Sequence, residues 1–85
     1  MDIREELCEH YGDDLMFADG YDDAIVGVCY GFDSGRVAYS IPKMIEIAAK
    51  ELSVDYDEAV EWLEYNTFGA FVGEHTPIYI DDQLA

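Results

Sequence analysis

The spacing of apolar residues changes at Ser40, and this change constrains the fold more than any other feature of the sequence. From 24 to 32, large residues recur at every second position, which is the period of a β-strand. From 41 to 52, apolar residues recur at every third or fourth position, as in an amphipathic helix. Turn-forming residues at 33–35 lead into a second strand at 36–39. We therefore predict a β-hairpin followed directly by a helix that Ser40 caps.

The two faces of the first predicted strand differ in size. One face carries mostly large side chains, at Ala24, Val26, Val28, Tyr30 and Phe32. The other face is narrow and consists of Ile25, Gly27, Cys29 and Gly31. Because glycine in a strand often marks a close approach, we expect another segment to pack tightly against the narrow face.

Three more elements complete the predicted fold. Residues 2–11 predict a short acidic helix, residues 56–66 a further helix and residues 78–80 a short strand. The order helix, strand, strand, helix, helix, strand predicts an α+β fold. In this fold, two to three helices cover one face of a small three-stranded sheet, antiparallel or mixed. An 85-residue chain has room for one hydrophobic core, so residues 1–85 are predicted to form a single domain.

Local signals mark where the later helix begins and ends. Asp55 with Glu58 three residues on resembles a capping box. Asn66 and Gly69 both suit the left-handed geometry that closes many helices. In the loop at residues 13–20, we expect one apolar side chain to reach the core, out of Leu15, Met16 and Phe17.

The net charge restricts the class of partner. Twenty acidic residues against four basic ones give a formal charge of −16, spread along the whole chain. Such a surface repels nucleic-acid phosphates and anionic lipid headgroups, so we expect no direct nucleic-acid binding and no membrane binding. The same field attracts basic protein surfaces. A simpler interpretation, that the charge serves only solubility, stays open.

The sequence favours a cytoplasmic protein. Its first residues have neither the basic region nor the apolar region of a signal peptide. No uncharged apolar run approaches the roughly 20 residues that a membrane span needs. Cys8 and Cys29 are therefore expected to be reduced.

Few residues could support catalysis or metal binding. Glu74, His75 and Thr76 place a base beside a hydroxyl group, but neighbouring side chains on an extended chain point apart. A loop in which these residues bond a turn is the simpler interpretation. The spacing of Cys8 and His10 does not match the paired ligands of structural zinc sites. We predict no enzyme activity, no metal and no cofactor.

The helix at 56–66 is more informative. Its predicted core side consists of Tyr56, Ala59, Val60 and Leu63. Acidic residues lie elsewhere on the helix, with Tyr65 among them and Trp62 at the boundary. Because Trp and Tyr are favoured at binding hot spots, we predict a partner-binding surface formed by Asp57, Glu58, Glu61, Trp62, Glu64 and Tyr65. The alternative is that another segment covers Tyr65. A helix this acidic cannot be the recognition helix of a DNA-binding helix-turn-helix.

Part of the chain resembles a known group of proteins. The segment DEAVEWLEYNTFGAFVGEHTPIY, at residues 57–79, is similar to the C-terminal half of small phage-encoded proteins of unknown function. Residues 23–28 and 36–40 resemble the hairpin of the same proteins. The resemblance implies a phage gene product in the host bacterial cytoplasm and brings no activity or ligand with it. Small acidic phage proteins of several unrelated families block host or defence enzymes, some by imitating DNA.

Together these features predict a protein-binding inhibitor or modulator. Its acidic face, in the strongest form a DNA mimic, would occupy a basic surface of a host or defence protein. A second hypothesis is a small-molecule or nucleotide binder, or a vestigial enzyme, that uses the elbow Gly73–Pro77. A homodimer is a third outcome that the sequence leaves open.

Overall fold

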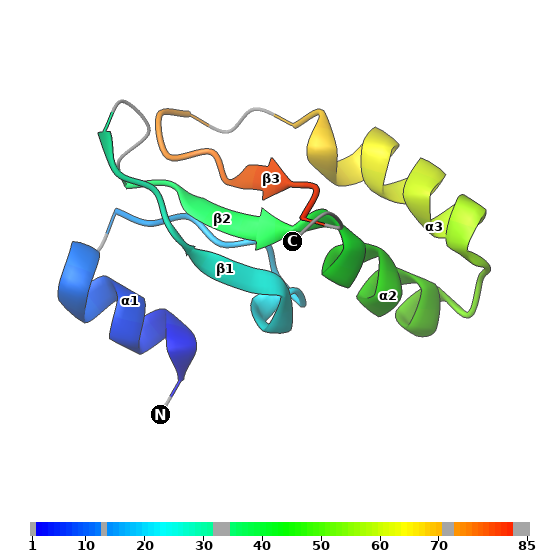
Figure 1. The fold of residues 1–85 in the computed structure, drawn as a ribbon, viewed down its shortest axis with the longest axis horizontal. Coiled ribbons are helices and arrows are strands. Elements are labelled where there is room, and N and C mark those ends of the chain that lie inside the picture. Colours follow the sequence, from blue (N-terminus) through cyan, green and yellow to red (C-terminus); the bar gives the residue numbers. More distant parts are fainter. Residues whose placement is uncertain (1, 13, 32–34, 71–72, 83–85) are drawn as a thin grey trace.

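Figure 1 shows the fold of the computed structural model, which describes residues 2–12, 14–31, 35–70 and 73–82. The elements follow the chain as α1 (Ile3–Tyr11), the 3-10 turn η1 (Asp22–Ala24), β1 (Ile25–Val28), β2 (Val37–Ser40), α2 (Ile41–Leu52), α3 (Tyr56–Leu63), the π-helical turn η3 (Glu64–Phe68) and β3 (Ile78–Ile80). The predicted α+β class and the predicted order of helices and strands are confirmed.

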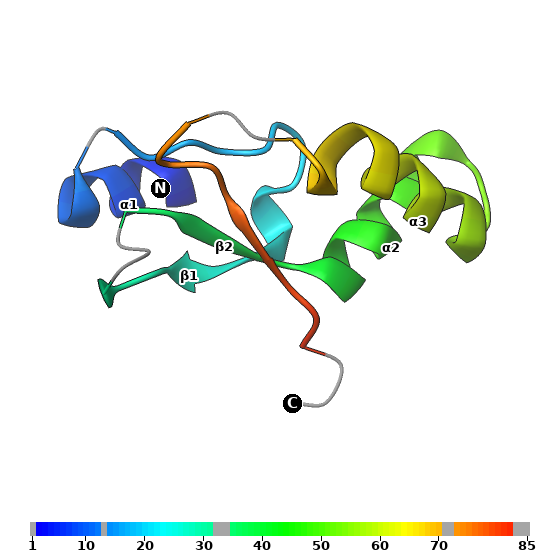
Figure 2. The same cartoon turned by 90° about the horizontal axis from the view of Figure 1, so that it is seen from above.

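The sheet is mixed and has β2 at its centre. β1 pairs with β2 antiparallel, through the hairpin, whereas β3 pairs with β2 parallel. A parallel neighbour needs a long crossover, and α2 and α3 supply it. Figure 2 shows that β2 runs straight into α2, so that α2 and α3 pack side by side beyond one end of the sheet.

The first strand is shorter than predicted, and its register changes at a β-bulge. Ile25 pairs with Tyr39 but Gly27 pairs with Ala38, which leaves Val26 as an additional residue. Ile25 and Val28 therefore both pack against the core, while Val26 is 58% exposed.

The predicted faces of this strand are wrong as a result. Val26 and Tyr30, expected on one large face with Ala24 and Val28, are exposed. Phe32 lies outside the described residues. The expected close packing at Gly27 and Gly31 is also wrong, because a Cβ on either would meet no described atom within 4 Å.

The hydrophobic core lies between one face of β2, the helices α2 and α3, and the segment before β1. Val37 and Tyr39 are fully buried on β2. The other buried apolar residues of this cluster are Leu15, Ala24, Met44, Ile45, Ala48, Ala59 and Leu63. Leu15 is thus the loop residue that enters the core, whereas Met16 is exposed and Phe17 packs at the edge.

Side-chain caps fix where α2 and α3 begin. Ser40 Oγ accepts a hydrogen bond from the Lys43 amide at 3.3 Å, and Asp55 Oδ1 accepts one from the Glu58 amide at 2.9 Å. The predicted left-handed ending of α3 is wrong. The helix instead widens into the π turn, and Gly69 has a φ of −90°. Among the described residues, no helix is long and apolar enough to cross a membrane.

Candidate functional site

The acidic residues of α3 lie on the side of the helix opposite the core. The cap at Asp55 fixes the first turn, and the helical period then places Ala59 and Leu63 against α2, both fully buried. The predicted surface residues are all exposed, and they lie on α3 and on the first two residues of η3, which continues it. We call them the acidic face of α3: Asp57, Glu58, Glu61, Trp62, Glu64 and Tyr65.

Two aromatic side chains project from the acidic face of α3. Tyr65 is 88% exposed and Trp62 is 40% exposed. The alternative in which another segment covers Tyr65 is therefore wrong for the described residues. Tyr65 belongs to the π turn, where the chain still runs helically, and the Asn66 amide donates a hydrogen bond to the Trp62 carbonyl at 2.9 Å. Two aromatics are thus presented to solvent on helical backbone.

One predicted core residue of α3 is misplaced. Tyr56, expected on the core side, is 52% exposed, whereas Val60 packs at the edge of the core. Tyr56 is the first residue of α3, and Figure 1 shows that α3 lies beyond one end of the sheet. The helical period therefore predicts the side of the helix on which Tyr56 lies but not whether another element covers it.

No basic residue offsets the charge of the acidic face locally in the sequence. Lys50 is the last Lys or Arg of the chain, and nine acidic residues follow it. Four of them are exposed on the acidic face of α3. Carboxylates gathered in this way, without cations between them, attract positively charged groups over about a Debye length, roughly 8 Å at physiological ionic strength.

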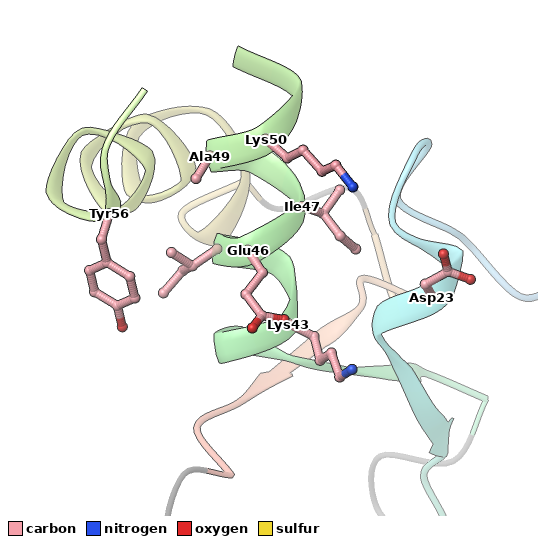
Figure 3. Close-up of a pocket in the computed structure, with 8 residues that line it drawn as sticks. Asp23, Lys43, Glu46, Ile47, Ala49, Lys50 and Tyr56 are labelled. Carbon is pink, nitrogen blue, oxygen red and sulfur yellow. The ribbon is translucent and has the colours of Figure 1, made fainter. Parts of the chain in front are cut away.

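The cations Lys43 and Lys50 gather elsewhere, on α2. Figure 3 shows both side chains extending from α2 toward Asp23. The two lysines line a hollow of about 730 Å³, and Tyr56, which also lines it, lies on the other side of α2. Sequence reasoning did not single out this hollow. The sequence does contain an indication of it, because Lys43 and Lys50 are seven residues apart and therefore lie on one face of the helix. Half of the four basic residues are therefore here and not on the acidic face of α3.

The elbow at Gly73–Pro77 bonds to the two residues that precede β2, Gly35 and Arg36. His75 Nδ1 lies 2.9 Å from the Gly35 carbonyl oxygen at the end of the hairpin, and the Thr76 hydroxyl donates to the Gly73 carbonyl at 2.7 Å. The Arg36 guanidinium donates to the Thr76 carbonyl. Thr76 is buried and His75 is half-buried, whereas Glu74 is exposed. The three predicted elbow residues therefore do not converge on one exposed point.

The cysteines and the acidic residues form no compact ligand set in the described part of the chain. Cys8 and Cys29 are both free thiols. Within the described ranges, no three His, Cys, Asp or Glu side chains come close enough to hold a metal ion together.

Comparisons with family models, with curated proteins and with solved structures found no match to this chain. The acidic face of α3 thus has to be interpreted from its own chemistry. It combines helical backbone, exposed carboxylates and two projecting aromatics.

Proposed function

We propose that this protein is a protein-binding inhibitor or modulator that acts through the acidic face of α3. The observation that carries the proposal is Tyr65, a large aromatic side chain that is 88% exposed among carboxylates. A tyrosine side chain that is this exposed contributes almost no buried apolar area to the stability of the fold. At interfaces, Tyr and Trp supply large, rigid contact areas at low cost in conformational entropy.

The charge of this face selects the partner. Four exposed carboxylates without a nearby basic residue in the sequence repel phosphate groups, which argues for a protein partner. A basic protein surface gains complementary charge and a faster encounter. The resemblance to phage-encoded proteins supports a partner in the bacterial host, such as a host or defence protein.

DNA mimicry is the strongest form of the proposal. Residues 57 and 64 are separated by roughly 10 Å along the helix axis at 1.5 Å per residue. Four carboxylates over that length give about one charge per 3 Å, which lies between the roughly 1.7 Å of duplex DNA and 3.4 Å of one strand. A groove that binds DNA would therefore meet a comparable charge density on this helix.

Capture from a bacterial host lysate tests the proposal with a matched pair of variants. Tyr65→Ala removes the exposed aromatic from the acidic face, whereas Tyr30→Ala removes one that is 78% exposed next to β1. A partner retained by the wild type and by Tyr30→Ala, but reduced about tenfold or more with Tyr65→Ala, supports the proposal. Its retention should fall steeply with added salt, and DNA should compete for it if the face is a mimic.

Two results would count against this function. Equal retention by Tyr65→Ala and the wild type would remove the acidic face of α3 from the interface. Binding that does not change with ionic strength would show that charge does not carry the interaction. A clear thermal stabilisation by a nucleotide or metabolite would instead favour the small-molecule hypothesis.

A further inference from the structure

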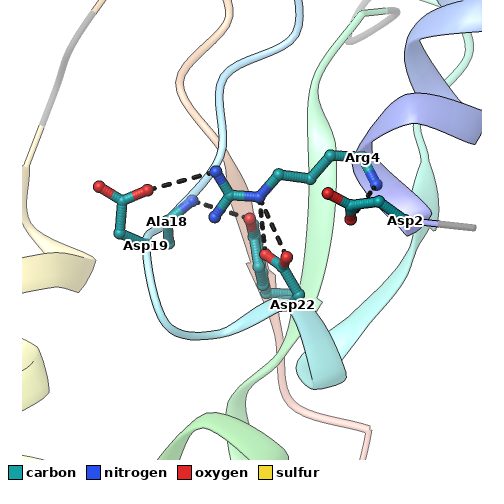
Figure 4. Close-up of polar contacts among 6 residues, drawn as sticks. Asp2, Arg4, Ala18, Asp19 and Asp22 are labelled. Atoms are coloured by element: carbon teal, nitrogen blue, oxygen red, sulfur yellow. Dashed lines mark hydrogen bonds and ion pairs between the residues drawn. The ribbon is translucent and has the colours of Figure 1, made fainter.

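Arg4 joins α1 to the segment before β1 by charge. Its Nε atom donates to both carboxylate oxygens of Asp22, at 2.9 and 3.1 Å, and its Nη1 atom lies 3.3 Å from Asp19 Oδ1. Figure 4 shows the guanidinium reaching from the helix to the turn that carries both acids. The same group stacks 5.0 Å from the centre of the Phe17 ring. The hydrogen bond to Asp22 raises the pKa of Arg4 above its ordinary value.

The partners of Arg4 are themselves fixed to the core. The Ala18 amide, next to Asp19, donates a 2.8 Å hydrogen bond to the hydroxyl of Tyr39. Tyr39 is fully buried on the central strand β2. Arg4 therefore attaches α1 to a segment that is anchored in the sheet.

The other contacts of α1 are few. None of its nine residues is buried. Leu7 and Cys8 pack at the edge of the core, and Tyr11 meets Tyr30 edge-on with ring centres 6.0 Å apart. Elements with little buried apolar area open at a lower free-energy cost than the rest of a domain.

The net negative charge of α1 disfavours its packing against the rest of the domain, which is also negative, and Arg4 counters this repulsion. Residues 2–11 carry four acids and one Arg, so with a neutral His10 their formal charge is −3. The whole chain carries −16, which leaves −13 on the remainder. Like charges of this size repel, and Arg4 is the one cation of the segment that offsets the repulsion.

We propose that α1 is a strap latched by Arg4, which opens independently of the rest of the domain and uncovers the surface under Leu7 and Cys8. Because the latch consists of ion pairs with Asp19 and Asp22, a cationic group that competes for these two carboxylates would release the strap. The inference concerns α1 and stands whether or not the acidic face of α3 binds a partner.

Thiol labelling of the full chain measures the opening directly. N-ethylmaleimide is uncharged, and mass spectrometry of the two cysteine peptides separates Cys8 on α1 from Cys29 after β1, which serves as the internal reference. Arg4→Gln should raise the labelling rate of Cys8 by about tenfold and leave that of Cys29 within about twofold. Lys50→Gln makes the same charge change at an exposed site and should alter neither rate by more than about twofold.

Two further measurements separate the latch from lost packing. Asp22→Asn should also speed Cys8 labelling, whereas Asp57→Asn on α3 should not. In Arg4→Gln, added NaCl should slow Cys8 labelling, since salt screens the repulsion that then remains.

The proposal is overturned if Arg4→Gln leaves Cys8 labelling within about twofold of the wild type. It is equally overturned if the variant accelerates Cys8 and Cys29 alike, because the whole domain would then be opening. A large effect of Leu7→Ala together with none of Arg4→Gln would show that apolar contacts, not the ion pairs, hold α1.

Discussion

Leu63 and Tyr65 are only two positions apart, yet substitution by Ala should lower the free energy of unfolding greatly at Leu63 and very little at Tyr65. Leu63 is fully buried, and truncation to Ala removes three carbons from water-free packing. At about 0.8 kcal/mol per buried carbon group the transfer cost is about 2.4 kcal/mol. The cavity left between α2 and α3 raises the expected loss to about 3–5 kcal/mol. Domains of 85 residues have a free energy of unfolding of roughly 4–13 kcal/mol, so this is a large fraction.

Tyr65→Ala should change the free energy of unfolding by less than about 1 kcal/mol, because its side chain is 88% exposed. Urea unfolding followed by circular dichroism at fixed pH gives both values, and Leu63→Ala should lower the melting temperature by at least about 10 °C. A loss of more than about 2 kcal/mol for Tyr65→Ala, with less than about 1 kcal/mol for Leu63→Ala, would refute the assignment of the core side of α3. The acidic face would then be part of the core.

Two further predictions concern the sheet. Gly35 has a φ of +81°, and a Cβ there would lie 3.0 Å from the His75 ring, so Gly35→Ala should cost at least about 1–2 kcal/mol in thermal unfolding. Gly69→Ala, at a φ of −90°, should be nearly neutral, and equal losses for both would contradict this reasoning. Burial raises the pKa of both Tyr39 and Tyr79, which holds them neutral in the fold. Their contribution to stability is therefore present below the unfolded pKa of about 10 and is lost as pH rises above it. Urea midpoints should fall above pH 10, and less so in Tyr39→Phe; a midpoint that stays level to pH 11 would be inconsistent with the raised pKa values.

The acidic face of α3 was predictable because its determinants are local. Asp55 caps the helix through an amide three residues away, and the helical period then separates Leu63 from Tyr65. The same local reasoning failed in β1. A bulge at Val26 depends on how β1 pairs with β2, and alternation along one strand cannot reveal it.

Residues far apart in the sequence make the contacts that prediction missed. Arg4 meets Asp22 across 18 positions, and His75 meets Gly35 across 40. Neither pair follows a helical or strand period, so no pattern in the chain marks it. The direction of β3 is a similar case, since the sequence left antiparallel and mixed sheets open and the parallel pairing with β2 decides between them.

The sequence by itself determined the −16 charge, the order of the elements, the caps at Ser40 and Asp55, and the side of α3 that is buried. These features rest on composition or on atoms within about four residues of one another, so the chain carries them before it folds. The tertiary structure alone decided the bulge at Val26, the contact of His75 with Gly35, and the attachment of α1 through Arg4. Each of these depends on two distant segments being brought together, and only the packing of the whole domain fixes that geometry.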